Sequence, residues 1–196
     1  MKATSKTHQS IVHLVELALF FALMVVLFFT PLGLITLGPL NLTLFFLPVI
    51  VGTLVLGLPS GLVLGLCFGV FSAIDAFTSP STLAAMTVAV SPFWAVFMCI
   101  VPRLLIPINV HLVYRLLSKN GKHGKTSLAI ASAAGTVTNT VFYLGTMYLI
   151  FFAAGLDTGL VLAVILGMGG IGALCETLIA AAAIPLIVIP LRKINK

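Results

Sequence analysis

Arg103 is the residue whose type and position most clearly point to chemistry. It lies in the apolar stretch 91–117, and the nearest Lys or Arg residues are Lys6 before it and Arg115 after it. On a helix, Arg103 would lie about 21 Å from the charged end of this stretch, within a hydrocarbon layer about 30 Å thick. A guanidinium at such depth costs about 2.5–3.5 kcal/mol, so it should face protein, water or a ligand. We expect an anion to meet it.

The composition indicates an α-helical integral membrane protein. The chain has 196 residues, of which 61% are apolar and 7% are charged. Soluble domains normally carry a much larger share of charged residues, so this composition is typical of a membrane protein. Long apolar runs with many small residues favour helices over a β-barrel. The net charge of +6 is carried mainly by residues at the ends of apolar stretches. These charges set membrane topology, so we expect no nucleic-acid partner.

The apolar stretches predict a single membrane domain, 1–196, with six transmembrane helices. The expected spans are about 11–29, 41–56, 59–76, 91–117, 128–153 and 160–189, and the second is expected to be interrupted at Pro48.

Charge predicts the orientation of these spans. The N-terminus, segment 118–126 and the C-terminus are basic, whereas segments 30–40, 77–81 and 155–159 contain no Lys or Arg. The positive-inside rule then places both termini in the cytoplasm. We expect a multi-pass protein of the plasma membrane.

Four further polar residues are expected at the depth of Arg103. Helix rise places Asn139, Glu176 and Asp75 about 21–24 Å from the cytoplasmic surface, and Tyr143 follows Asn139 by one turn. Arg can clamp a carboxylate with two hydrogen bonds, and Asn and Tyr can bind amide or hydroxyl groups. These residues therefore predict a pocket for a small anion in the outer half of the membrane.

Each of these residues also has a structural interpretation. Arg103 and Glu176 could form an ion pair that only joins two helices. Asn139 could simply hydrogen-bond another helix, and Asp75 could end its helix among the lipid headgroups. The sequence alone leaves these alternatives open.

Small residues predict close helix contacts. Ala18 and Ala22 lie one turn apart on the first span, which creates a face that another helix can approach, although two ordinary alanines would look the same. Glycines recur every four residues in the third span, at 57, 61, 65 and 69.

The sequence lacks the residue patterns of an enzyme. It contains no nucleophile–base pair, no spacing typical of metal ligands and no nucleotide-binding motif. We therefore expect neither catalysis nor a cofactor. Uphill transport would need energy from a partner or an ion gradient.

The chain resembles the S components of energy-coupling factor (ECF) vitamin transporters. The most specific part is residues 32–77, which read LGLITLGPLNLTLFFLPVIVGTLVLGLPSGLVLGLCFGVFSAIDAF. The arrangement of Arg103 and Asn139 is similar to that of the pantothenate-specific branch. The resemblance implies a subunit that captures pantothenate outside the cell and works with a transmembrane T subunit and two ATPases. It also implies that Ala18 and Ala22 face the partner, that Arg103 and Asn139 face the ligand, and that segments 30–40 and 77–81 cover the site.

Two other functions compete with this interpretation. An S component for another vitamin, such as riboflavin, would favour an aromatic cage, for which the expected slab offers few rings. An autonomous ion-coupled transporter of small anions would need a carboxylate relay, for which only Glu176 and Asp75 are candidates, and it would favour a repeat symmetry that we do not find.

Overall fold

The computed structural model of the chain describes residues 2–30, 33–37, 40–119, 124–156 and 158–194. The middle of the basic segment, 120–123, lies outside the described residues, as does Asp157 in segment 155–159.

The molecule is a bundle of membrane helices. Its long helices are α1 (Lys2–Phe29), α3 (Leu58–Thr78), α5 (Pro92–Lys119), α6 (Lys125–Ala153) and α8 (Gly170–Ile194). In the described part of the chain, these five helices supply the segments that are long and apolar enough to cross a membrane. The helical membrane class is therefore confirmed, while the number of six crossings and their orientation stay predictions.

The expected second span is not one helix. Strands β1 (Leu34–Leu37) and β2 (Leu40–Thr43) form an antiparallel hairpin, and helix α2 begins only at Phe46 and ends at Leu56. The expectations of a structureless segment 30–40 and a helical start at residue 41 were therefore wrong. The interruption at Pro48 was also wrong, because this residue lies in the first turn of α2, where a helix needs no proline N–H.

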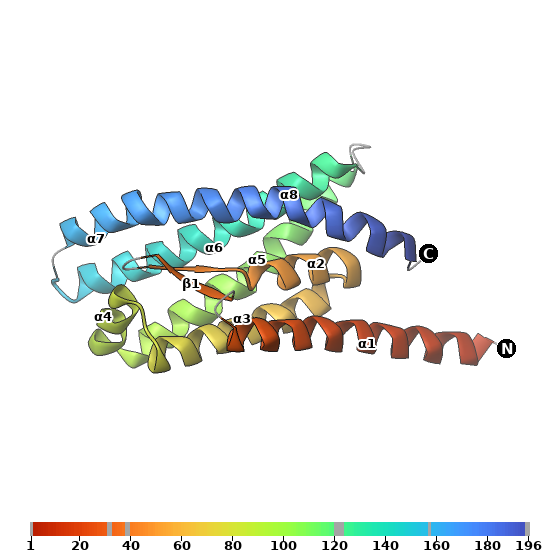
Figure 1. Ribbon diagram of the computed structural model, residues 1–196, viewed down its shortest axis with the longest axis horizontal. Helices are drawn as coiled ribbons and strands as arrows, with labels where there is room; N and C mark the ends of the chain where they lie inside the picture. Colours follow the sequence, from red (N-terminus) through yellow and green to blue (C-terminus); the bar gives the residue numbers. More distant parts are fainter. Residues whose placement is uncertain (1, 31–32, 38–39, 120–123, 157, 195–196) are drawn as a thin grey trace.

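The last expected span is also divided. Helix α7 (Thr158–Val164) leads into a π-helical turn (Ile165–Gly169), and α8 follows directly. A π-helical turn is rare and locally widens the backbone. A separate short helix, α4 (Thr82–Val90), precedes α5. Both chain ends lie at one end of the bundle, and α4 and α7 lie at the other (Figure 1).

Helix α2 forms the centre of the bundle. Eight of its eleven residues are buried, and it packs against α1, α3, α5 and α8. The main apolar core surrounds it and includes Phe46, Ile50, Ile106 and Ile184. A second apolar cluster joins α3, α4, α5 and α6 and includes Met98 and Phe151. Between these two clusters, α5 carries Arg103.

The glycines of α3 let α5 approach closely, as their spacing predicts. A Cβ atom on Gly65 would lie 2.8 Å from the backbone oxygen of Arg103, and one on Gly69 would lie 3.0 Å from Cα of Ile100. Gly57 has a different role, since its φ of 95° forms the turn between α2 and α3. The position of Arg103 in the bundle thus depends on the absence of side chains along α3.

We predict that Gly65→Ala destabilises the protein by about 1–3 kcal/mol, because the added methyl group must displace the α5 backbone. Gly145→Ala is the matched control, since this glycine lies in the interior of α6 and a Cβ atom there meets nothing within 4 Å. Thermal unfolding of the detergent-solubilised variants measures both effects. Equal melting temperatures for the two variants would contradict the proposed close contact.

Candidate binding site

The Arg103 side chain is enclosed by protein. Its exposed fraction is 3%, and its Cζ atom lies 4.3 Å from the ring centre of Tyr143 and 5.1 Å from that of Phe68. One terminal nitrogen, Nη1, donates to the Met98 carbonyl at 3.1 Å, and Nη2 donates to Ser72 Oγ at 3.0 Å. Ring faces and neutral oxygens therefore replace water around this cation.

These contacts leave part of the guanidinium unsatisfied. Its Nε atom is buried and has no hydrogen-bond partner among the described residues. A buried donor without a partner costs about 1–3 kcal/mol. The Nε–H group is part of an edge with which arginine binds carboxylates through two parallel hydrogen bonds. The geometry therefore suits a planar anion.

Asn139 is the second buried polar residue with an unused atom. It is 7% exposed, and its Oδ1 atom has no hydrogen-bond partner within the described ranges. It precedes Tyr143 by one turn of α6, so it lies on the same side of that helix as the ring beneath Arg103. By contrast, Asn109 of α5 donates to the Thr138 hydroxyl and so joins α5 to α6.

Glu176 has a backbone partner. Its Oε1 atom accepts a hydrogen bond of 3.0 Å from the backbone N–H of Thr43 in β2, and the residue is 7% exposed. The adjacent Thr177 hydroxyl lies 3.2 Å from that of Thr136, which joins α8 to α6. Glu176 is close enough to Arg103 for an electrostatic interaction, but the hydrogen bonds of the two side chains go to other groups.

Asp75 lies at the end of α3, and its side chain is half-buried. It is within electrostatic range of Tyr143, so it borders the region around Arg103. Of the five predicted residues, Tyr143 thus contacts Arg103, Glu176 and Asp75 lie within electrostatic range of this pair, and Asn139 lies on the Tyr143 side of α6. We call these five residues the polar layer. Which of them touch a ligand stays a prediction.

Sequence reasoning missed three residues of this layer. Phe68 and Ser72 lie one turn apart on α3 and contact the guanidinium, and Thr43 meets Glu176 from the hairpin. The spacing of Phe68 and Ser72 was a usable signal, because residues four apart share a helix face. Thr43 carried no comparable signal, since its role depends on a pairing with a residue 133 positions away.

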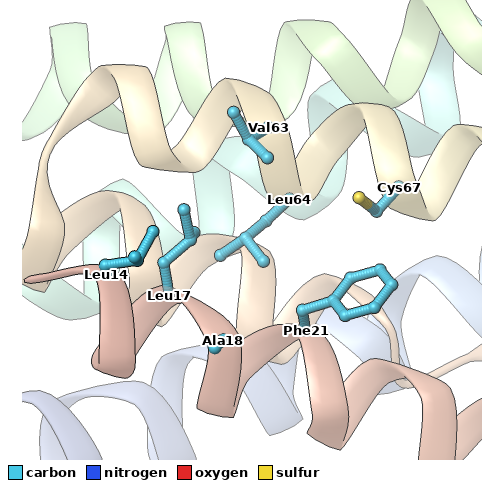
Figure 2. Close-up of a pocket in the computed structure, with 7 residues that line it drawn as sticks. All are labelled: Leu14, Leu17, Ala18, Phe21, Val63, Leu64 and Cys67. Atoms are coloured by element: carbon cyan, nitrogen blue, oxygen red, sulfur yellow. The ribbon is translucent and has the colours of Figure 1, made fainter.

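The predicted partner-facing residues lie elsewhere. Ala18 and Ala22 are exposed on α1, which forms one edge of the bundle (Figure 1). Ala18 belongs to a wholly apolar groove of about 320 Å³ between α1 and α3 (Figure 2). The residues that line this groove are Leu14, Leu17, Ala18, Phe21, Val63, Leu64 and Cys67.

The sequence of the chain is similar to those of known proteins. The family described as "ECF transporter, substrate-specific component" matches residues 12–188. The pantothenic acid transporter PanT of Lactococcus lactis subsp. cremoris (strain MG1363) is 33% identical over 150 residues, an alignment that covers 69% of this chain and 71% of the relative. The chain therefore belongs to the substrate-specific components of ECF transporters, a family of membrane transport proteins and not of enzymes.

Proposed function

We propose that this chain is the substrate-binding subunit of an ATP-driven ECF importer and that it captures pantothenate from outside the cell. The observation that carries the proposal is the buried Arg103 guanidinium, which lies between two rings and keeps an unused Nε–H donor. The name of the L. lactis relative supports the choice of pantothenate.

The chemistry of pantothenate matches the unused groups. Its carboxylate would accept hydrogen bonds from Arg103, which would satisfy Nε and neutralise the buried cation. Its amide N–H would donate to Oδ1 of Asn139, which otherwise has no partner among the described residues. Tyr143 would keep the guanidinium plane fixed, because the cation already lies on its ring. Arg103 and Asn139 are therefore the proposed primary ligand contacts, and Tyr143 orients the first of them.

The proposed topology has six crossings and cytoplasmic termini. Helix α2 has 11 residues, too few to cross alone, but β2 and α2 in succession reach about 30 Å. A strand at membrane depth is tolerated where protein surrounds it and its backbone hydrogen bonds are satisfied. Pairing with β1 and the bond from Thr43 to Glu176 supply such partners. The position of both termini at one end of the bundle supports an even number of crossings (Figure 1).

The proposed partners are a transmembrane T subunit and two ATPases. The T subunit would dock on α1 at Ala18 and Ala22, where short side chains permit close helix contact. This exposed face lies outside the buried layer around Arg103, so partner binding and ligand binding use separate surfaces.

We predict that Arg103→Ala weakens pantothenate binding by at least about 30-fold, because the ligand carboxylate loses its buried partner. Arg103→Lys should also bind weakly, since an ammonium cannot reproduce the planar fork. Arg115→Ala is the matched control, because Arg115 is exposed near the end of α5. Isothermal titration calorimetry on the purified proteins measures the affinities. Wild-type affinity in Arg103→Ala would refute the assignment.

A second prediction separates ligand contact from helix packing. Asn139→Ala should weaken pantothenate binding by about 1–3 kcal/mol, because the ligand amide loses its acceptor. Asn109→Ala should instead lower the melting temperature and leave affinity unchanged, since Asn109 hydrogen-bonds Thr138. Calorimetry and thermal unfolding of both variants decide between the roles. If Asn139→Ala changes stability alone, Asn139 is a packing residue.

A third prediction concerns the partner face. The double variant Ala18→Trp/Ala22→Trp should bind pantothenate normally in detergent but fail to co-purify with the T subunit, because bulky side chains block helix approach. Gly145→Trp/Leu149→Trp is the matched control, with the same spacing on an exposed face of α6.

Affinity and co-purification are measured on the same preparations. Normal assembly of the α1 variant would contradict a docking role for this face. Loss of both properties would instead show that the two alanines pack the fold.

A further inference from the structure

Thr43 combines a fixed backbone with an unused hydroxyl. It is the last residue of β2 and is 7% exposed. Its backbone N–H donates to Glu176, whereas its Oγ1 atom is buried and has no hydrogen-bond partner within the described part of the chain. Buried hydroxyl groups in folded proteins nearly always have a partner. Thr43 is connected to the region of Arg103 through Glu176, so a ligand held there is a candidate partner for this hydroxyl.

The hairpin geometry explains why Glu176 is needed. Thr43 lies opposite Leu34, and the hydrogen bond from Leu44 N to Gly33 O closes the ladder beyond this pair. Thr43 and Leu34 are thus a non-hydrogen-bonded pair, and the Thr43 N–H points away from β1 toward the open edge of the hairpin. An edge N–H buried without a partner would be costly. Glu176 supplies the acceptor and fixes the position of Thr43.

Electrostatics argue against a direct contact between Glu176 and the ligand's charged end. Glu176 lies within electrostatic range of Arg103. A carboxylate ligand held by Arg103 would therefore be repelled by an ionised Glu176 at short range. Thr43 carries no charge, and its hydroxyl can both donate and accept. It suits the hydroxylated end of an anion whose carboxylate lies on Arg103.

We propose that Thr43 is a specificity-determining residue that binds the ligand's hydroxyl groups through Oγ1, and that Glu176 is a positioning residue that acts through the Thr43 backbone. The proposal rests on the proposed function, since it takes pantothenate as the ligand. It reassigns Glu176 from direct ligand contact to support of the hairpin.

The test compares two ligands on the purified full chain. Pantothenate carries two hydroxyls, and its dideoxy derivative keeps the carbon skeleton, amide and carboxylate without them. Thr43→Val, which retains the backbone N–H, should bind pantothenate about 3- to 10-fold more weakly and the dideoxy derivative as the wild type does. Thr43→Ser should restore pantothenate affinity to within about 2-fold. Thr53→Val is the control, because Thr53 is also buried but its hydroxyl donates to the Val49 carbonyl of its own helix.

Two substitutions test whether Glu176 acts through its hydrogen-bond acceptor or through its charge. Glu176→Gln keeps a side-chain acceptor and should retain pantothenate affinity within about 2-fold, whereas Glu176→Ala should lose about 3- to 10-fold. Hydrogen–deuterium exchange of the ligand-free protein should show faster exchange of the Thr43 amide in Glu176→Ala and near-native exchange in Glu176→Gln. If the substitutions only lowered overall stability, amide exchange would also be faster in Glu176→Gln.

Several results would overturn the proposal. Unchanged pantothenate affinity in Thr43→Val, or an equal loss for both ligands, would remove Thr43 from specificity. Equal defects in Glu176→Gln and Glu176→Ala, or unchanged amide exchange in both, would remove the positioning role. If the wild type binds pantothenate and the Thr43 and Glu176 variants bind it with the same affinity, the proposed function stands and this inference is wrong. If the wild type does not bind pantothenate, the proposed function and the Thr43 assignment both fall, and amide exchange still decides the role of Glu176.

Discussion

The burial of one cation constrains the centre of this protein. Removing a guanidinium from water costs several kcal/mol unless other groups replace its hydration. Here Tyr143, Phe68, a backbone carbonyl and a serine hydroxyl do so, yet Nε keeps no partner among the described residues. The protein groups thus replace most of the hydration of this cation and leave one donor available to an anion.

The surrounding elements hold this cation in place. Gly65 and Gly69 allow α5 to lie against α3, which brings Phe68 and Ser72 to the guanidinium. Phe68 also stacks on Phe45, which lies just after the hairpin, with 5.4 Å between the ring centres. The cation, the α3–α5 contact and the base of the hairpin therefore form one connected unit. We expect an anion bound at Arg103 to stiffen the hairpin through this contact.

Much of this arrangement could be predicted from the sequence, because membrane burial makes single polar residues conspicuous. The enclosure of Arg103 by protein was expected from its place within a long apolar stretch, and the glycine spacing of α3 predicted its close packing. The hairpin was missed although leucine alternates with polar residues in Leu40–Thr43, which is a strand pattern. Four residues directly before a long apolar stretch were too few to separate this strand from the start of the following helix. The partner of Glu176 was also inaccessible, because it depends on a long-range contact to a backbone N–H. That the predicted residues bind a ligand is still a hypothesis, which geometry supports and binding measurements must decide.

The central claim is that Arg103 binds the carboxylate of the transported anion. The most direct test measures how the wild type and Arg103→Ala distinguish pantothenate from pantothenol, in which an alcohol replaces the carboxylate. We predict that the wild type prefers pantothenate by at least about 30-fold and that Arg103→Ala binds both compounds weakly and equally. A variant that keeps the wild-type preference for pantothenate would contradict the account, because the carboxylate would then be recognised by another group.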